Sequence, residues 1–203
     1  QASAIIFNGE IYNYKELESD LPADLSLQGG SDTEVLLELC ESKGLKQSLS
    51  LLNGMWAFSF LDSKNNKLFL VRDRVGIKPL YYKIENGDLI FASEVKTILS
   101  VSKEKHQLNV EQIANYINHS VQDADNSSFF QGINSIPQDF LARFDRTRLN
   151  IFNNPTNDVF ETTAQTSQLV KSITIEAEIE ARDGFGAVAS PLITVTIVAQ
   201  NPC

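Results

Sequence analysis

Cysteine is scarce in this sequence, since the 203 residues contain only Cys40 and Cys203. Two cysteines so far apart in the chain indicate neither a disulfide framework nor a cysteine-rich zinc site. We therefore expect a reducing, cytoplasmic setting. Long apolar runs are missing too, because the segment PLITVTIVA is much shorter than the roughly 18 residues that a membrane-spanning helix needs.

Positive charge is also in short supply. The sequence has 17 Lys and Arg residues against 26 Asp and Glu, which gives a formal net charge of -9. Proteins that bind nucleic acid or anionic membranes do so through an excess of basic residues. We therefore predict small molecules or proteins as partners, and no nucleic acid or membrane. His106 and His119 have no cysteine or paired carboxylate near them in the sequence, so we predict no metal site.

The first fifty residues favour one strand followed by helices. The apolar run from Ala4 to Phe7 predicts a strand that ends at Asn8-Gly9, and Asn13 followed by Glu16 is typical of the start of a short helix. The segment GGSDTEVLLELCESKG predicts a second helix, with Ser31 as its N-cap and Gly44 just beyond its end.

From Gly54 the pattern changes to short β-rich runs. MWAFSFLD, KLFLVRD, KPLYYKI and DLIFASE predict an antiparallel meander, and SSFFQGINSIPQDFLARFD predicts a loop followed by a short strand. Two helices are predicted at Glu94 to Leu99 and Val110 to His119, the second capped by Asn109. Strands in one block with helices before and after them indicate the α+β class.

The Asn-Gly pair at Asn8-Gly9 allows two interpretations. Such pairs are abundant in tight hairpin turns, but only the residues EIY follow before the next helix signal, which is too short an arm for a hairpin. The alternative is a pair of hydrogen-bond donors, one amide side chain and one unhindered backbone N–H, that converge on one oxygen. Asp32 has a simple explanation as well, since an acid in the first turn interacts favourably with the helix dipole. In VRDRVGIKPLYY, ion pairs that fix the loop are a simpler explanation than catalysis.

Six segments in the same order give the sequence a family resemblance: FNGEIYNY, GGSDTEVLLEL, LNGMWAFSFLD, LFLVRDRVGIKPLYY, LIFASEVKTIL and GINSIP. They resemble the class II glutamine amidotransferase domain of asparagine synthetases, whose nucleophile is an N-terminal cysteine. The resemblance covers Ile5 to about Asp145. It implies a four-layer α/β/β/α sandwich of two antiparallel sheets, of the Ntn-hydrolase type and here incomplete.

The resemblance also implies a glutamine site. Asn8 would donate from its side chain and Gly9 from its backbone to the tetrahedral oxyanion, Glu10 would form part of the glutamine pocket, and Asp32 would pair with the ammonium of L-glutamine. In the family the cysteine thiol attacks the glutamine side-chain amide, which forms a thioester and releases ammonia. The ammonia then reaches a synthetase domain that uses ATP and Mg²⁺ to activate aspartate.

The sequence differs from the family pattern at both ends. It opens with Gln1 on a predicted strand, so we expect a fragment or a processed chain without the nucleophilic cysteine, which neither Cys40 nor Cys203 can replace. The family's PPGH segment is replaced by PQDF at Pro137 to Phe140, and ASPL stands near where a pyrophosphate-binding loop would fall. We therefore expect no cofactor in this chain.

Two domains are predicted. Residues 1–150 would form a partial glutamine amidotransferase type 2 domain. Residues 151–203 would form a linker and a degenerate or foreign tail that resembles the start of a synthetase domain, with a helix at Gln165 to Ala181 and a strand interrupted by Pro191.

The predicted function is the ammonia-supplying, glutamine-hydrolysing domain of an asparagine synthase-like amidotransferase (a ligase), inactive as this fragment. Its expected partners are L-glutamine, the synthetase domain of the parent chain and a second copy in a homodimer. The alternative is a non-catalytic binding or assembly module derived from the same fold.

Overall fold

The computed structural model describes residues 3–65, 67–120, 126–138, 140–145, 148–153, 174–177 and 193–197. Its backbone contacts divide the chain into two units that alternate along the sequence. The first unit comprises Gln1–Pro79 and Ile136–Gln165, and the second comprises Leu80–Ser135 and Thr166–Cys203. The predicted domain boundary at residue 150 stays a prediction.

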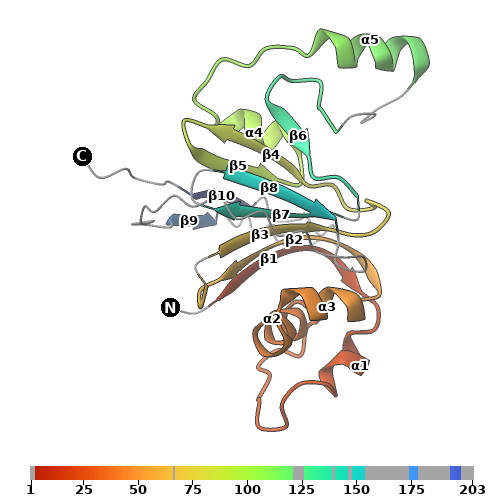
Figure 1. Cartoon of the computed structure of the whole chain (residues 1–203), viewed down its shortest axis with the longest axis vertical. Coiled ribbons are helices and arrows are strands. Elements are labelled where there is room, and N and C mark those ends of the chain that lie inside the picture. The colour runs from red at the N-terminus through yellow and green to blue at the C-terminus, as the bar shows by residue number, and fades with distance from the viewer. Residues whose placement is uncertain are drawn as a thin grey trace, which may run out of the picture. The chain divides into compact units, whose positions relative to one another are not determined.

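The first unit contains a five-stranded antiparallel sheet with helices packed on it (Figure 1). The strand order is β1-β2-β3-β7-β8. The strands are β1 (Ala4–Ile11), β2 (Gly54–Asp62), β3 (Lys67–Arg72), β7 (Phe140–Asp145) and β8 (Arg148–Asn153). The helices are α1 (Tyr14–Glu18), α2 (Asp32–Lys43) and α3 (Leu45–Leu51).

The core of this unit lies between the helices and one face of the sheet. Strands place alternate side chains on opposite faces, and the β2 side chains that join this core are Trp56, Phe58 and Phe60. The helical side chains packed against them are buried residues of α2 and α3: Val35, Leu36, Leu39, Cys40, Leu45 and Leu49. The helices therefore cover this face of β1, β2 and β3, and the other face carries the alternate residues of each strand.

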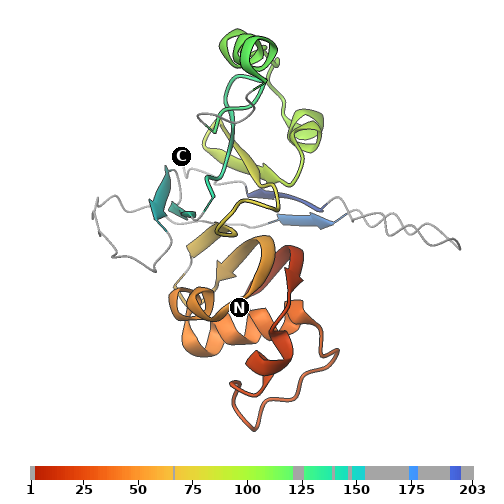
Figure 2. The ribbon, with the colours of Figure 1, turned by 90° about the vertical axis from the view of Figure 1, so that its right-hand side faces the viewer.

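The second unit is built on another five-stranded antiparallel sheet, with the order β6-β4-β5-β10-β9 (Figure 2). Its strands are β4 (Tyr81–Glu85), β5 (Asp88–Ala92), β6 (Ile133–Ser135), β9 (Thr174–Ala177) and β10 (Ile193–Ile197). Its helices are α4 (Val95–Val101) and α5 (Val110–His119). Ile98 of α4 packs with Ile90 of β5 and Ile133 of β6 in a small core.

The α+β class and the two antiparallel sheets predicted from the sequence are confirmed. The single meander is wrong, because β2 and β3 pair in one sheet whereas β4 and β5 pair in the other. A loop fixed by buried polar contacts, described below, separates β3 from β4. The predicted loop before residue 140 also contains a strand, β6.

Helix ends agree well with the sequence signals. Ser31 and Asn109 cap α2 and α5 with their side chains, as predicted, and Gly44 follows α2. Asn13 is the N-cap residue of α1, but its side chain makes no capping bond. Its side-chain amide instead donates to Leu51 O (2.9 Å) and accepts from Asn53 N (2.9 Å), which ties the start of α1 to the segment between α3 and β2.

The C-terminal predictions fall largely outside the described residues. Within the predicted helix at Gln165 to Ala181, Thr174–Ala177 form β9, so the helix prediction is wrong for those four positions. They pair with β10, which begins two residues after Pro191 and agrees with the predicted strand there. Among the described residues, no helix is both long enough and apolar enough to span a membrane.

Candidate functional site

Asn8-Gly9 lies inside a strand and forms no hairpin. β1 continues to Ile11, which pairs with Gly54, so the predicted strand end at Asn8-Gly9 is wrong. The short EIY arm is no obstacle, because β1 pairs with β2, which comes much later in the chain. By contrast, Asn86-Gly87 forms the two-residue turn between β4 and β5, with φ of 53° and 90°. The interpretation that Asn8-Gly9 is not a hairpin turn is therefore confirmed.

Glycine is required at position 9 by the close approach of β2. A Cβ placed on Gly9 would lie 2.2 Å from Met55 O and 2.7 Å from Trp56 Cα. The same approach occurs two positions along the ladder, where Gly54 pairs with Ile11 and a Cβ on Gly54 would lie 2.2 Å from Glu10 O. Both obstacles are backbone atoms, which cannot rotate away as a side chain does. The two glycines therefore allow β1 and β2 to approach closely at the C-terminal end of β1.

The hydrogen bonds at the end of β1 reveal the direction of the Gly9 N–H. Tyr12 N donates to Asn53 O at 2.8 Å across the ladder, whereas Ile11 N donates to Asp32 Oδ2 at 3.1 Å, away from β2. Along an antiparallel strand, successive N–H groups alternate between pointing at the partner strand and pointing away from it, so residues two apart direct their N–H groups to the same side. The N–H of Gly9 therefore points away from β2, toward the same edge of β1 as that of Ile11.

Asp32 reaches this edge from the start of α2. It is the first residue of the helix, as the sequence predicts, and it is half-buried. Oδ1 accepts a hydrogen bond from Thr33 N at 2.8 Å, and Oδ2 accepts the bond from Ile11 N. These two bonds fix the carboxylate between the helix and the strand. The bond to Ile11 carries no sequence signal, because it joins segments that meet only in the folded chain.

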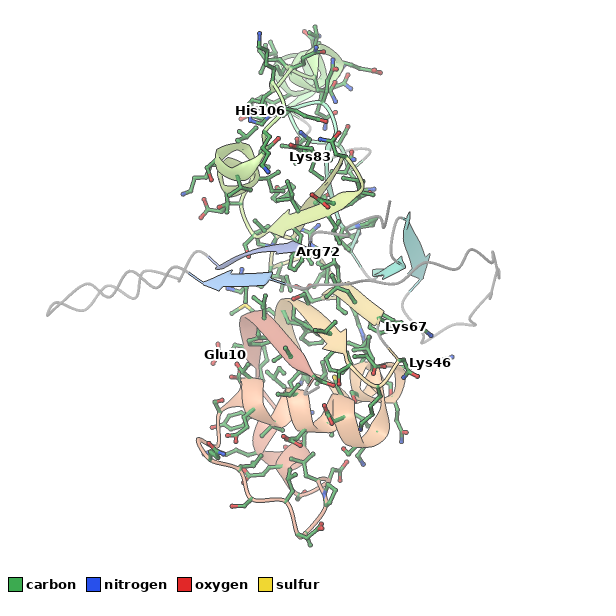
Figure 3. All side chains as sticks on the ribbon, turned by 90° about the vertical axis from the view of Figure 1, so that its left-hand side faces the viewer. Glu10, Lys46, Lys67, Arg72, Lys83 and His106 are labelled. Atoms are coloured by element: carbon green, nitrogen blue, oxygen red, sulfur yellow. The ribbon has the colours of Figure 1, made fainter. Side chains whose placement is uncertain are left out.

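Asn8 and Glu10 lie on the face of β1 opposite the helices. Ile5, Phe7 and Ile11 contact the core under α2 and α3, and the alternate positions face the other way. Asn8 is half-buried, whereas Glu10 is exposed (Figure 3). The four predicted site residues therefore share the C-terminal half of β1, with the Gly9 N–H and Asp32 at its edge and the side chains of Asn8 and Glu10 on the face away from the helices.

The loop after β3 supports the strands beside this site. The carboxylate of Asp73, 1% exposed, accepts hydrogen bonds from four backbone N–H groups. Their donors are Trp56, Val75, Ile77 and Lys78. Arg72 donates to three carbonyl oxygens, those of Gly76, Lys78 and Ile136, each at 2.8 Å. The predicted fixing of this loop is right, but within the described part of the chain it is done by hydrogen bonds from the Arg72 and Asp73 side chains to backbone groups and not by ion pairs. Trp56, held by Asp73, is the cross-strand partner of Gly9.

Cys40 is unsuited to nucleophilic catalysis. Its side chain is buried in the core under α2, and burial raises the pKa of its thiol to about 12 despite a hydrogen bond from Ser48. A thiol with this pKa is almost entirely protonated near neutral pH, and the thiolate is the reactive form. His106, on the second unit, has its Nε2 2.9 Å from Leu99 O. In the described part of the chain, no three His, Cys, Asp or Glu residues gather as a metal site would require.

Two antiparallel sheets with helices make this an α+β protein. The chain belongs to the glutamine amidotransferase domain family, whose family model matches residues 1–153. Two curated relatives have names that agree with this family. The chain is 42% identical over 110 residues to "Putative asparagine synthetase [glutamine-hydrolyzing] 2" of Methanocaldococcus jannaschii, covering 54% of the chain and 21% of that protein. It is 40% identical over 136 residues to "Asparagine synthetase [glutamine-hydrolyzing] 2" of Bacillus subtilis, covering 65% of the chain and 18% of that protein.

The chain thus spans about a fifth of the length of these relatives. Solved structures show the same fold at lower identity. The glutamine phosphoribosylpyrophosphate amidotransferase of B. subtilis, complexed with ADP and GMP, matches with a TM-score of 0.52 and 18% identity, covering 76% of this chain and 30% of its own. A structure described as the allosteric regulatory enzyme of purine biosynthesis matches with a TM-score of 0.51 and 19% identity, covering 76% of this chain and 29% of its own.

Proposed function

We propose that this chain binds L-glutamine at the C-terminal half of β1, as part of an ammonia-supplying domain of the asparagine-synthetase type. The family membership supports glutamine as the substrate class, and the six sequence segments support the asparagine-synthetase branch. The geometry of the β1 edge carries the proposal for the site.

The supporting observation is that the Gly9 N–H and the Asp32 carboxylate share one edge of β1. Gly9 and Ile11 are two residues apart, which is about 7 Å along a strand, and Ile11 N marks the position of the carboxylate. In extended glutamine the side-chain amide carbon lies roughly 5 Å from the α-nitrogen. One glutamine molecule therefore has the length to place its amide near Gly9 and its ammonium near Asp32.

The roles of the four residues follow from this placement. Asp32 accepts a hydrogen bond from the substrate ammonium at Oδ2, which retains a lone pair beyond the bond from Ile11 N, whereas Oδ1 accepts from the backbone N–H and the hydroxyl of Thr33. The N–H of Gly9 and the side-chain amide of Asn8 donate to the oxygen that gains negative charge when the amide carbon becomes tetrahedral. Glu10 borders the pocket beside them.

Hydrolysis also requires a nucleophile, and we propose that residues 1–203 by themselves bind glutamine without hydrolysing it. In the reaction, a thiolate adds to the amide carbon, the tetrahedral intermediate expels ammonia after protonation of its nitrogen, and water then cleaves the thioester to give glutamate. Cys40 cannot act as this thiolate because its thiol is buried and has a raised pKa. Cys203 lies outside the described residues.

Ammonia would pass to a synthetase domain of the parent protein, and that domain would hold any ATP and Mg²⁺. The length of the curated relatives supports such a second domain. We also propose a cytoplasmic location, supported by the two widely separated cysteines. A homodimer stays a prediction.

Ligand selectivity tests the proposed site. We expect ¹⁵N-labelled chain 1–203 to bind L-glutamine, with amide shifts at Gly9 and Ile11, and to bind N-acetyl-L-glutamine about tenfold more weakly or worse, because acetylation removes the charge that Asp32 recognises. Ammonia release should stay at the background rate. Equal affinity for the two ligands would contradict the role of Asp32, and glutamine turnover would contradict the absence of a nucleophile. Failure to bind glutamine at all would favour the alternative of a binding or assembly module.

A further inference from the structure

A loop in front of α2 wraps around a single carboxylate. Three consecutive backbone N–H groups donate to the side chain of Glu34: Gln28 N to Oε1 at 2.6 Å, and Gly29 N and Gly30 N to Oε2 at 2.8 Å each. Successive N–H groups that converge in this way form a concavity for an anion. The chain fills this concavity with its own side chain, and hydrogen bonds from Gln28 and then Gly29 lower the pKa of Glu34 below its usual value of 4.5.

This arrangement differs from an ordinary capping box. Glu34 is the third residue of α2, and in a capping box its carboxylate would bind the N–H of the N-cap residue, Ser31. One of the two hydrogen bonds of the capping box is present, since the backbone Glu34 N donates to the side-chain Ser31 Oγ at 3.2 Å. The carboxylate instead reaches past Ser31 to the three residues before it. Glu34 therefore holds both the N-cap and the loop that leads into it.

Asp32 lies between these two attachments. The loop 28–30 enters Ser31, Asp32 follows at once, and Glu34 comes two residues later. The direction of the Asp32 carboxylate depends on the position of its backbone at the first turn of α2. Its Oδ2 must meet Ile11 N on β1, so a small displacement of this turn changes the separation of Asp32 from Gly9.

We propose that Glu34 is a positioning residue for substrate glutamine, which fixes Asp32 by holding the loop 28–31 against the start of α2. The proposal rests on the proposed function of Asp32 as the ligand of the substrate ammonium. Glu34 itself does not touch the substrate. A helix-stabilising role alone would depend on negative charge in the first turn, whereas positioning depends on a side chain that is long enough to reach the loop and has two oxygens to accept from its three N–H groups.

The variants E34D and E34Q separate these roles. E34D keeps the charge in the first turn but is one methylene too short to reach the three N–H groups. E34Q keeps the length but loses the charge and replaces one of the two acceptor oxygens with an NH₂ group, which cannot accept from the loop. The matched control is E38Q, one turn further along α2, whose side chain has no hydrogen bond or ion pair with the described residues. Each ¹⁵N-labelled chain 1–203 is titrated with L-glutamine and with N-acetyl-L-glutamine, and the Ile11 amide is followed in the absence of ligand.

We expect E34D and E34Q each to reduce the preference for L-glutamine over its N-acetyl derivative by about tenfold. Their Ile11 amide should shift, and the amides of Gln28, Gly29 and Gly30 should exchange faster with solvent. E38Q should change none of these. A purely helix-stabilising role would leave E34D with the selectivity of the parent chain, and that result would overturn the proposal.

Failure of the glutamine function is distinguishable from failure of the positioning role. If no chain binds glutamine but E34D displaces the Ile11 amide, Asp32 is positioned by Glu34 and the proposed substrate is wrong. If the parent chain binds glutamine and the Ile11 amide is unchanged in both variants, the positioning role is wrong and the proposed function stands. E34D keeps the negative charge in the first turn of α2, so this variant still tests the proposal if E34Q does not fold.

Discussion

Replacing Gly9 with alanine tests the close approach of β1 and β2. The added Cβ would meet two backbone atoms of β2, at 2.2 Å from Met55 O and 2.7 Å from Trp56 Cα. Relieving such contacts requires the strands to move apart, and overpacking of this kind costs about 1–3 kcal/mol. Loss of alignment in the neighbouring ladder bonds adds about 1 kcal/mol. We therefore expect Gly9→Ala to lower the free energy of unfolding by about 2–4 kcal/mol.

Urea unfolding measures this effect with an internal reporter. Trp56 is the single tryptophan, it is 2% exposed, and it is the cross-strand partner of Gly9, so its fluorescence follows the first unit. With a slope of about 2 kcal/mol per molar urea, the midpoint should fall by about 1–2 M. Gly29→Ala is the matched control, because its nearest neighbour would be Glu34 Oε2 at 3.5 Å, an ordinary contact. A Gly9→Ala midpoint equal to that of Gly29→Ala would refute the argument.

Three other predictions concern charged and thiol groups. Lys83→Met should lower the stability of the second unit by about 3–5 kcal/mol, because Lys83 and Glu85 form a buried ion pair at 2.8 Å. The amide exchange rates of β5 measure this loss of stability, and Lys105→Met, at an exposed position, should leave them unchanged. Burial alone would raise the pKa of Glu85, but hydrogen bonds led by that from Lys83 hold it at about 2. The stabilisation is thus complete above the usual value of 4.5 and is lost as the pH falls toward 2, so an acid titration with no loss of stability in that range would count against the pair. In a Cys203→Ser chain at pH 8, iodoacetamide should modify Cys40 only after unfolding, because burial raises its pKa to about 12; rapid modification of the native chain, detected by mass spectrometry, would show the thiol to be accessible.

Local signals in the sequence predicted individual elements and their ends. Ser31 and Gly44 delimit α2 because caps act over a few residues. The end of β1 was predicted incorrectly because its partner strand is remote in sequence, and no local pattern near Asn8 reports it. The sequence pattern also does not indicate which sheet each strand joins, since β3 and β4 are consecutive strands that pair in different sheets.

The candidate site, like the fold, can be predicted only in part from the sequence. Residue types and the family resemblance indicate Asn8, Gly9, Glu10 and Asp32, but the bond that joins Asp32 to Ile11 depends on the folded position of α2 against β1. In the sequence, Glu34 is an acid three residues after Ser31, which is typical of a helix start. Its three bonds to the loop depend on the path of residues 28–30, which a helix-start signal does not specify.

The affinity of the Asp32→Asn chain for L-glutamine tests the account most directly. Asparagine keeps one oxygen for Ile11 N but loses the charge, so the substrate ammonium loses an ionic hydrogen bond worth about 1.5–3 kcal/mol. We expect the dissociation constant of L-glutamine to rise at least about tenfold, with little change in the urea midpoint. Asp24→Asn, in the exposed loop before α2, should bind as the parent chain does. Equal affinities of the Asp32→Asn, Asp24→Asn and parent chains would contradict the assignment of Asp32 to the glutamine site.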